Sequence, residues 1–149
     1  MSEHKTQLVW QRTTADFDWK TYNREHTVRY KNGQTISGSA ATAFFGSPDC
    51  VDPEEMFTGS LSSCHMLTFL AIASKKRFIV DAYNDEATGY LEKNESGKMM
   101  MTRVILRPDI TFGGVNLPTE QELHDMHELA HKQCFIASSV TTEIVIQPL

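Results

Sequence analysis

Residues 127 to 131 read His-Glu-Leu-Ala-His, the HExxH pattern of zinc proteases. In that pattern two imidazoles one helical turn apart bind the metal, and the glutamate acts on a water. At 100° per residue, four possible ligands fall within a helical arc of about 80°: His124, His127, His131 and Cys134. No further His or Glu follows at a zincin spacing, so a polar stripe facing solvent or an interface is the simpler interpretation.

Two cysteines are candidates for a different chemistry, that of thiols. Cys64 lies among small residues in an uncharged stretch, and Cys134 follows 70 residues later in a helical segment. A free cysteine is often only a small buried hydrophobe. Two helical cysteines could, however, meet across a core and cycle between thiol and disulfide. Cys50 falls in a loop rich in turn-forming residues, and we interpret it as a spectator.

The bulk composition limits the classes of function. The 149 residues fit one domain, so we expect a single domain over 1–149. The chain has 14 basic and 19 acidic residues, and the basic ones form no run, which argues against nucleic-acid binding. The first residues lack the apolar core of a signal peptide, which predicts a cytoplasmic protein. An odd count of three cysteines argues against a disulfide framework.

One segment has nearly the length of a membrane span. Residues 56–73 contain no charged side chain, but they include a glycine, three serines, two threonines, a cysteine and a histidine. That polarity is too high for a lipid-facing helix. We therefore expect no membrane association, and instead a helix covered on all sides by protein.

Two helices should position the candidate residues. The run Asp52-Pro53-Glu54-Glu55 opens the first with an N-cap, a proline at the first helical position and a glutamate at the third. This helix contains Cys64 and ends near the cations of 74–78. The second is expected over Thr119–Cys134, where Thr119 and Glu122 form a capping box.

Strands are expected around these helices. The alternating or β-rich segments are 6–12, 26–30, 35–40, 81–92, 98–106, the start of 107–118, and 138–149. An Asn-Gly pair at 32–33 predicts a hairpin. The order predicts an α+β fold with antiparallel sheets around a central buried helix. Because a chain this short has little material to cover an uncharged helix, a homodimer sharing one core is expected.

Three motifs together resemble one family. Asp52-Pro53-Glu54-Glu55, then Cys64, then Ala130-His131-x-x-Cys134, match in order and spacing the OsmC/Ohr family of thiol-dependent peroxidases. The resemblance extends over about residues 18–148. It implies the OsmC/Ohr fold as an intertwined homodimer, and it makes the HExxH match a coincidence.

The resemblance also implies a reaction. Cys64 would attack an organic hydroperoxide and become a sulfenic acid, and Cys134 would condense with it to a disulfide. No bound cofactor is implied, and an external dithiol, such as a dihydrolipoyl group, would reduce the disulfide. A buried thiol has a raised pKa, so a cation should stabilise the thiolate, and arginine suits that role.

The arginine is assigned by alignment. One branch of the family takes it from the N-terminal strands, which matches Arg24 better than Arg29; these two would point to opposite faces of a strand. The other branch takes it from a loop position that holds Phe44 and Phe45 here. The resemblance implies that Glu54 holds the arginine. Ten residues of helix, about 15 Å, separate Glu54 from Cys64, so either the arginine bridges them, the helix starts later, or the partner subunit brings one of them across.

Some features leave alternatives open. Phe135 stands where many family members have proline, so we expect Cys134 to sit deeper in a continuous helix. Apolar side chains could line a substrate entrance or belong to the core: Phe44, Phe45, Met56, Phe57 and Met66. The rival functions are a non-catalytic domain that senses redox state or binds an apolar ligand, and a zinc site on the histidine stripe.

Overall fold

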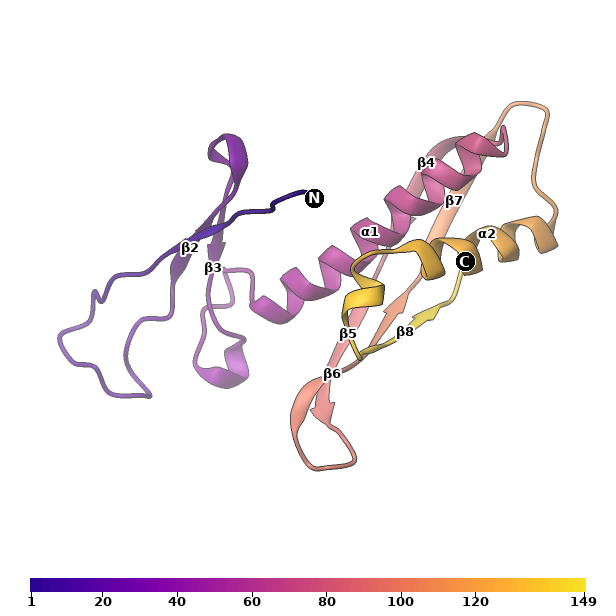
Figure 1. The fold of residues 1–149 in the computed structure, drawn as a ribbon. Coiled ribbons are helices and arrows are strands. Elements are labelled where there is room, and N and C mark those ends of the chain that lie inside the picture. Colours follow the sequence, from indigo (N-terminus) through magenta and orange to yellow (C-terminus); the bar gives the residue numbers. More distant parts are fainter. The chain divides into compact units, whose positions relative to one another are not determined.

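The computed structural model describes residues 1–149 and divides them into two compact units, residues 1–56 and 57–149 (Figure 1). The expectation of a single domain over 1–149 stays a prediction.

The first unit is a small antiparallel sheet with long connections. Its strands lie in the order β1 (Gln7–Val9), β2 (His26–Arg29) and β3 (Thr35–Gly38). A short 3-10 turn, η1 (Lys31–Gly33), joins β2 to β3, and Asn32 and Gly33 both have positive φ there. Asn and Gly tolerate this left-handed backbone, so the predicted hairpin is confirmed. A second 3-10 turn, η2 (Thr42–Phe44), precedes the first helix.

The second unit contains two sheets, one whole helix and most of another. The helices are α1 (Pro53–Lys75), whose first turn lies in the first unit, and α2 (Glu120–Gln133). One sheet pairs β4 (Ile79–Asp85) with β7 (Pro108–Gly113). The other has the order β5 (Thr88–Lys93), β6 (Met99–Leu106) and β8 (Glu143–Ile146). The predicted α+β class is confirmed.

Two details of the strands differ from expectation. The prediction of a single strand over 81–92 is wrong. This segment is divided between β4 and β5, which belong to different sheets. The side chain of Asp85 explains the break: it accepts hydrogen bonds from the Ser62 hydroxyl at 2.5 Å and from the Arg107 amide at 2.6 Å. In addition, β8 pairs parallel to β6 rather than antiparallel. Parallel pairing requires a long crossover, which β7 and α2 supply.

The main hydrophobic core joins α1 and α2 to the β4–β7 sheet, which runs behind α1 in Figure 1. Its buried members are Phe69, Ile72, Ala73, Phe78, Met126 and Ala130. A second cluster, built around Leu61, Val104 and Leu106, lies where α1 meets β6. The helix α1 is long and apolar enough to span a membrane by length and composition, a test that core helices of soluble proteins also pass.

The start of α2 shows that the sequence defines a helix boundary locally. The Thr119 hydroxyl accepts from the Glu122 amide at 3.2 Å, and the Glu122 carboxylate accepts from the Thr119 amide at 2.9 Å. This is the predicted capping box.

Replacing Thr119 with alanine should lower the free energy of unfolding by about 1 kcal/mol, because the Glu122 amide loses its acceptor. Urea denaturation followed by circular dichroism would measure the change. Thr119→Ser retains the acceptor and should match the wild type. Equal stability of the alanine variant would show that the box contributes nothing.

Candidate active site

The helix α1 places Cys64 near its middle, on the border between a buried and an exposed face. A capping box fixes the start of the helix: Glu55 N donates to the Asp52 carboxylate at 2.7 Å, and Asp52 N donates to the Glu55 carboxylate at 3.0 Å. Cys64 is half-buried, and its carbonyl accepts from the Thr68 hydroxyl at 2.8 Å. Its thiol can therefore be reached from solvent.

Cys134 lies at the end of α2, where the helical conformation stops. The helix ends at Gln133, and Cys134 is the C-cap with φ −69° and ψ 114°, an extended conformation. The expectation that it lies within a continuous helix is wrong. After Cys134 the chain enters the short 3-10 turn η3 (Ala137–Ser139), whose first amide donates to Cys134 Sγ at 3.4 Å. A proline is therefore not needed to end this helix.

The two thiols meet across the α1–α2 interface. The side chain of Cys64 lies close enough to Cys134 to act on the pKa of its thiol. Cys134 is only 1% exposed. Burial, followed by a hydrogen bond that the Cys134 thiol donates to the Cys64 side chain, raises the pKa of the Cys134 thiol to about 11. Both causes favour the protonated form, so Cys134 is a thiol, not a thiolate, at pH 7.

A groove of about 940 Å³ opens beside Cys64, along the exposed face of α1 and the end of α2. Its lining is largely apolar or small and includes Leu67, Ala71, Phe135 and Ile136. The only charged residue in the lining is Lys132, and nothing in the sequence around it indicates a site residue. Phe135 is 83% exposed, so it forms part of the groove wall rather than of the core.

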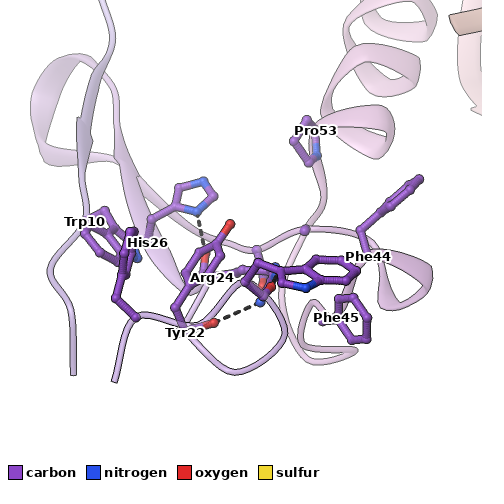
Figure 2. Close-up of a pocket in the computed structure, with 11 residues that line it drawn as sticks. Trp10, Tyr22, Arg24, His26, Phe44, Phe45 and Pro53 are labelled. Carbon is purple, nitrogen blue, oxygen red and sulfur yellow. Dashed lines mark hydrogen bonds between the residues drawn. The ribbon is translucent and has the colours of Figure 1, made fainter. Parts of the chain in front are cut away.

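The other two predicted catalytic residues belong to the first unit. Arg24 precedes β2 and donates from Nη1 to the Tyr22 carbonyl at 2.9 Å and from Nη2 to the Trp19 carbonyl. Its guanidinium stacks over the Tyr22 ring at 4.1 Å (Figure 2). Glu54 lies in the first turn of α1 and is half-buried. Their action on Cys64 stays a prediction, as does the choice of Arg24 over the exposed Arg29.

The histidine stripe does not form a metal centre. His124 is exposed, whereas His127 is buried and points to α1. No group of three or more His, Cys, Asp or Glu side chains is arranged to hold a metal ion. The zinc alternative therefore has no support in the geometry.

Comparison with known proteins defines the family. A family model described as OsmC-like protein matches residues 46–148, more than two thirds of the chain. The chain belongs to the OsmC-like family. None of the curated proteins matches it.

Solved structures share the fold of this OsmC-like protein. An OsmC-like protein of unknown function from Vibrio cholerae is 45% identical, with a TM-score of 0.95 and full coverage of both chains. The organic hydroperoxide resistance protein OhrB of Bacillus subtilis is 14% identical, with a TM-score of 0.70 over 99% of this chain and 98% of its own. A hydroperoxide resistance protein from Elizabethkingia anophelis is 19% identical, with a TM-score of 0.68 over 99% and 95%.

The OsmC-like chain also contains a buried histidine pair that the sequence did not reveal. Next to Cys64, His65 Nε2 lies 3.1 Å from His127 Nδ1 in a hydrogen bond, and the two rings are stacked. His127 also stacks on Phe69 at 4.5 Å between centroids. The pKa of each histidine is lowered to about 4, mainly by burial, so both are neutral at pH 7. The only local signal was the HExxH match, which suggested a metal instead.

Proposed function

We propose that this OsmC-like protein is a thiol-dependent peroxidase that reduces organic hydroperoxides through Cys64 and Cys134. The observation that carries the proposal is the proximity of the two thiols, with Cys64 close enough to act on the Cys134 pKa, beside a largely apolar groove that Cys64 lines. Solved hydroperoxide resistance proteins with the same fold are consistent with it.

The reaction balances with the groups present and one external reductant. The Cys64 thiolate attacks a peroxide oxygen of ROOH, the O–O bond breaks, and ROH leaves after taking up a proton. Cys64 is then a sulfenic acid. The Cys134 sulfur attacks the sulfenic sulfur, a disulfide forms, and the hydroxyl leaves as water with the Cys134 proton. A dithiol, for which a dihydrolipoyl group is our candidate, reduces the disulfide and becomes oxidised itself.

The proposal includes a homodimer in a reducing compartment. Within one chain, only 28% of the most apolar 18-residue window of α1 is buried. Its exposed face carries small or apolar side chains without charge: Gly59, Ser60, Ser63, Leu67 and Ala71. A second copy of the chain would cover part of this face and form the opposite wall of the groove beside Cys64. Three free thiols suit the cytoplasm.

A thiol titration after one equivalent of cumene hydroperoxide tests the proposal. Wild type and Cys50→Ser should each lose two thiols. Cys64→Ser should lose none. Cys134→Ser should lose one, which dimedone would trap as a sulfenic acid at Cys64.

Retention of all thiols in the wild type would overturn the peroxidase proposal. Turnover is measured separately, by adding dihydrolipoamide and following the loss of peroxide. Loss of two thiols without multiple turnovers with any dithiol would identify the rival function, a redox sensor.

A further inference from the structure

A small pocket lies between α2 and the C-terminal segment, and the thiol chemistry does not use it. Its volume is about 190 Å³, which is less than the sites of drug-sized molecules and equals the space of about six waters in the liquid. One wall is a single face of α2, because the helical residues in the lining are three or four positions apart. They are Glu120, Leu123, His124, His127 and Glu128.

The opposite wall is fixed by backbone hydrogen bonds. It consists of Ile146, the last residue of β8, and Pro148. The amides on either side of Pro148 donate to the carbonyls of Leu106 and Pro108, at 2.9 Å and 3.0 Å. The C-terminal segment is therefore tied to β6 and β7, and the pocket exists without a ligand to form it.

One buried polar atom at this pocket has no partner in the chain. His127 is only 3% exposed, and its Nδ1 is turned to His65 on α1. The pocket is lined only by α2 and the C-terminal segment, so the ring edge left for it carries Nε2. This Nε2 is buried and makes no hydrogen bond. Buried polar groups are nearly always paired, so an unpaired one at a pocket wall indicates a ligand that bonds there.

The charges around the pocket decide which kind of ligand this is. Glu120 and Glu128 line it, no lysine or arginine does, and neither carboxylate forms an ion pair within the chain. An anion would be repelled, whereas a cation with N–H donors would be attracted. His127 is neutral at pH 7, and when its Nδ1 carries the proton and donates to His65, its Nε2 is an acceptor.

Two further observations narrow the class of cation. The side chains are not arranged to hold a metal ion, which leaves an organic cation. The rest of the lining is aliphatic and comes from both walls: Leu123, Ile146 and Pro148. A ligand that satisfies all of these groups has N–H donors at one end and a few carbons at the other.

We propose that this pocket binds a small primary ammonium ion with a short aliphatic chain. One N–H of the ligand bonds to His127 Nε2, its charge faces Glu120 and Glu128, and its carbons contact the aliphatic lining. The proposal goes beyond the peroxidase function and needs neither cysteine. Cys64→Ser protein should therefore bind as wild type does, which separates failure of this site from failure of the proposed reaction.

Titration of the full chain with butylammonium chloride at pH 7, followed by NMR of ¹⁵N-labelled histidine side chains, tests the site. This amine is protonated at pH 7, as lysine is. The Nε2 signal of His127 should shift along a saturable curve, because the ligand bonds to that atom. Sodium chloride at the same concentrations should not produce the shift.

Charge variants test the two carboxylates. The double variant Glu120→Gln/Glu128→Gln should bind butylammonium about tenfold more weakly, which is about threefold for each exposed carboxylate neutralised. Asp125→Asn is the matched control. Asp125 is also exposed on α2, but it accepts from the Gln121 side chain and lies outside the pocket, so binding should be unchanged.

Two other probes separate charge, N–H donation and shape. The neutral 1-butanol should bind wild type and the double variant equally, and more weakly than butylammonium binds wild type; equal binding also shows that the pocket of the variant is intact. Tetramethylammonium has the charge but no N–H, so it should bind more weakly and leave the Nε2 signal of His127 in place.

Three results would overturn the proposal. The first is the absence of a saturable shift at His127 with butylammonium. The second is equal butylammonium affinity of wild type and Glu120→Gln/Glu128→Gln. The third is binding of tetramethylammonium as tight as that of butylammonium, since the N–H bond to His127 would then contribute nothing.

Discussion

At pH 7, Cys134 in the folded protein should react with iodoacetamide about a hundredfold more slowly than the same cysteine in unfolded chain. The thiolate is the reacting form, and burial with the hydrogen bond to Cys64 raises the Cys134 pKa from 9.0 to about 11. A thiol with a pKa higher by about two is about a hundredfold less ionised at neutral pH. Burial of the Cys134 side chain slows the reaction further.

Brief labelling at low conversion, followed by peptide mass spectrometry, would give the initial rate for each cysteine. The pH profile separates ionisation from steric shielding. The Cys134 rate should keep rising about tenfold per pH unit beyond pH 9, where an ordinary cysteine approaches its plateau. Cys64→Ser should keep most of the effect, because burial is its largest cause. A Cys134 rate that levels off near pH 9 would contradict the raised pKa.

The raised pKa of Cys134 suits the order of steps in the proposed reaction. A resolving thiol that stays protonated does not compete for the peroxide, and it holds its proton until a sulfenic acid has formed beside it. The proton then leaves with the hydroxyl as water. In the proposed reaction the raised Cys134 pKa therefore suits the resolving role, and Cys64 rather than Cys134 lines the groove.

The sequence predicts the features that depend on nearby residues. The capping boxes at Asp52–Glu55 and Thr119–Glu122 each involve a few consecutive residues, and both are present. The Asn-Gly turn is equally local. By contrast, the break between β4 and β5 depends on hydrogen bonds from Ser62 and Arg107 to Asp85, more than twenty residues away in each direction. No alternation pattern contains that information.

The candidate site shows the same limit. Spacing places Cys64 and Cys134 on two helices, and the family resemblance pairs them, but the end of α2 just before Cys134 depends on the turn that follows. Periodicity places His127 on a stripe without showing that this stripe faces His65, 62 residues earlier. Lys132 is likewise brought to the groove beside Cys64 only by the fold.

The buried histidine pair should make the protein acid-sensitive between about pH 6.5 and pH 4. In the folded protein the pKa of His65 and of His127 is about 4, against 6.5 without burial. Between these values the unfolded chain binds protons that the folded protein does not, so stability falls as the pH falls through this window. At pH 4.5 the loss is about 2–3 kcal/mol for each histidine.

The contacts explain why protonation is unfavourable. One nitrogen of each ring is committed to the bond between His65 and His127, and Nε2 of His127 is buried without a hydrogen-bond partner. A second proton would put an unpaired N–H and a charge against Phe69. Positive charge on His131 would also lower the pKa of His65. The negative charge of Asp85 raises that pKa, but by less than burial lowers it.

Leucine variants isolate the pair from the carboxylates that titrate in the same range. Replacing both histidines removes both polar groups together, so the double variant should be nearly as stable as wild type at pH 7. His127→Leu alone leaves His65 Nε2 unpaired in the core and should lose about 1–3 kcal/mol at pH 7.

Urea denaturation at pH 7.0 and 4.5 measures how much stability each protein loses in acid. The double variant should lose less than wild type, by about 2–3 kcal/mol per histidine removed. His124→Gln, an exposed change on the same helix, should follow wild type. If wild type and the double variant lose the same stability in acid, the histidine pair is not the acid-sensitive element. The contact between α1 and α2 beside Cys64 then does not depend on protonation of His65 and His127.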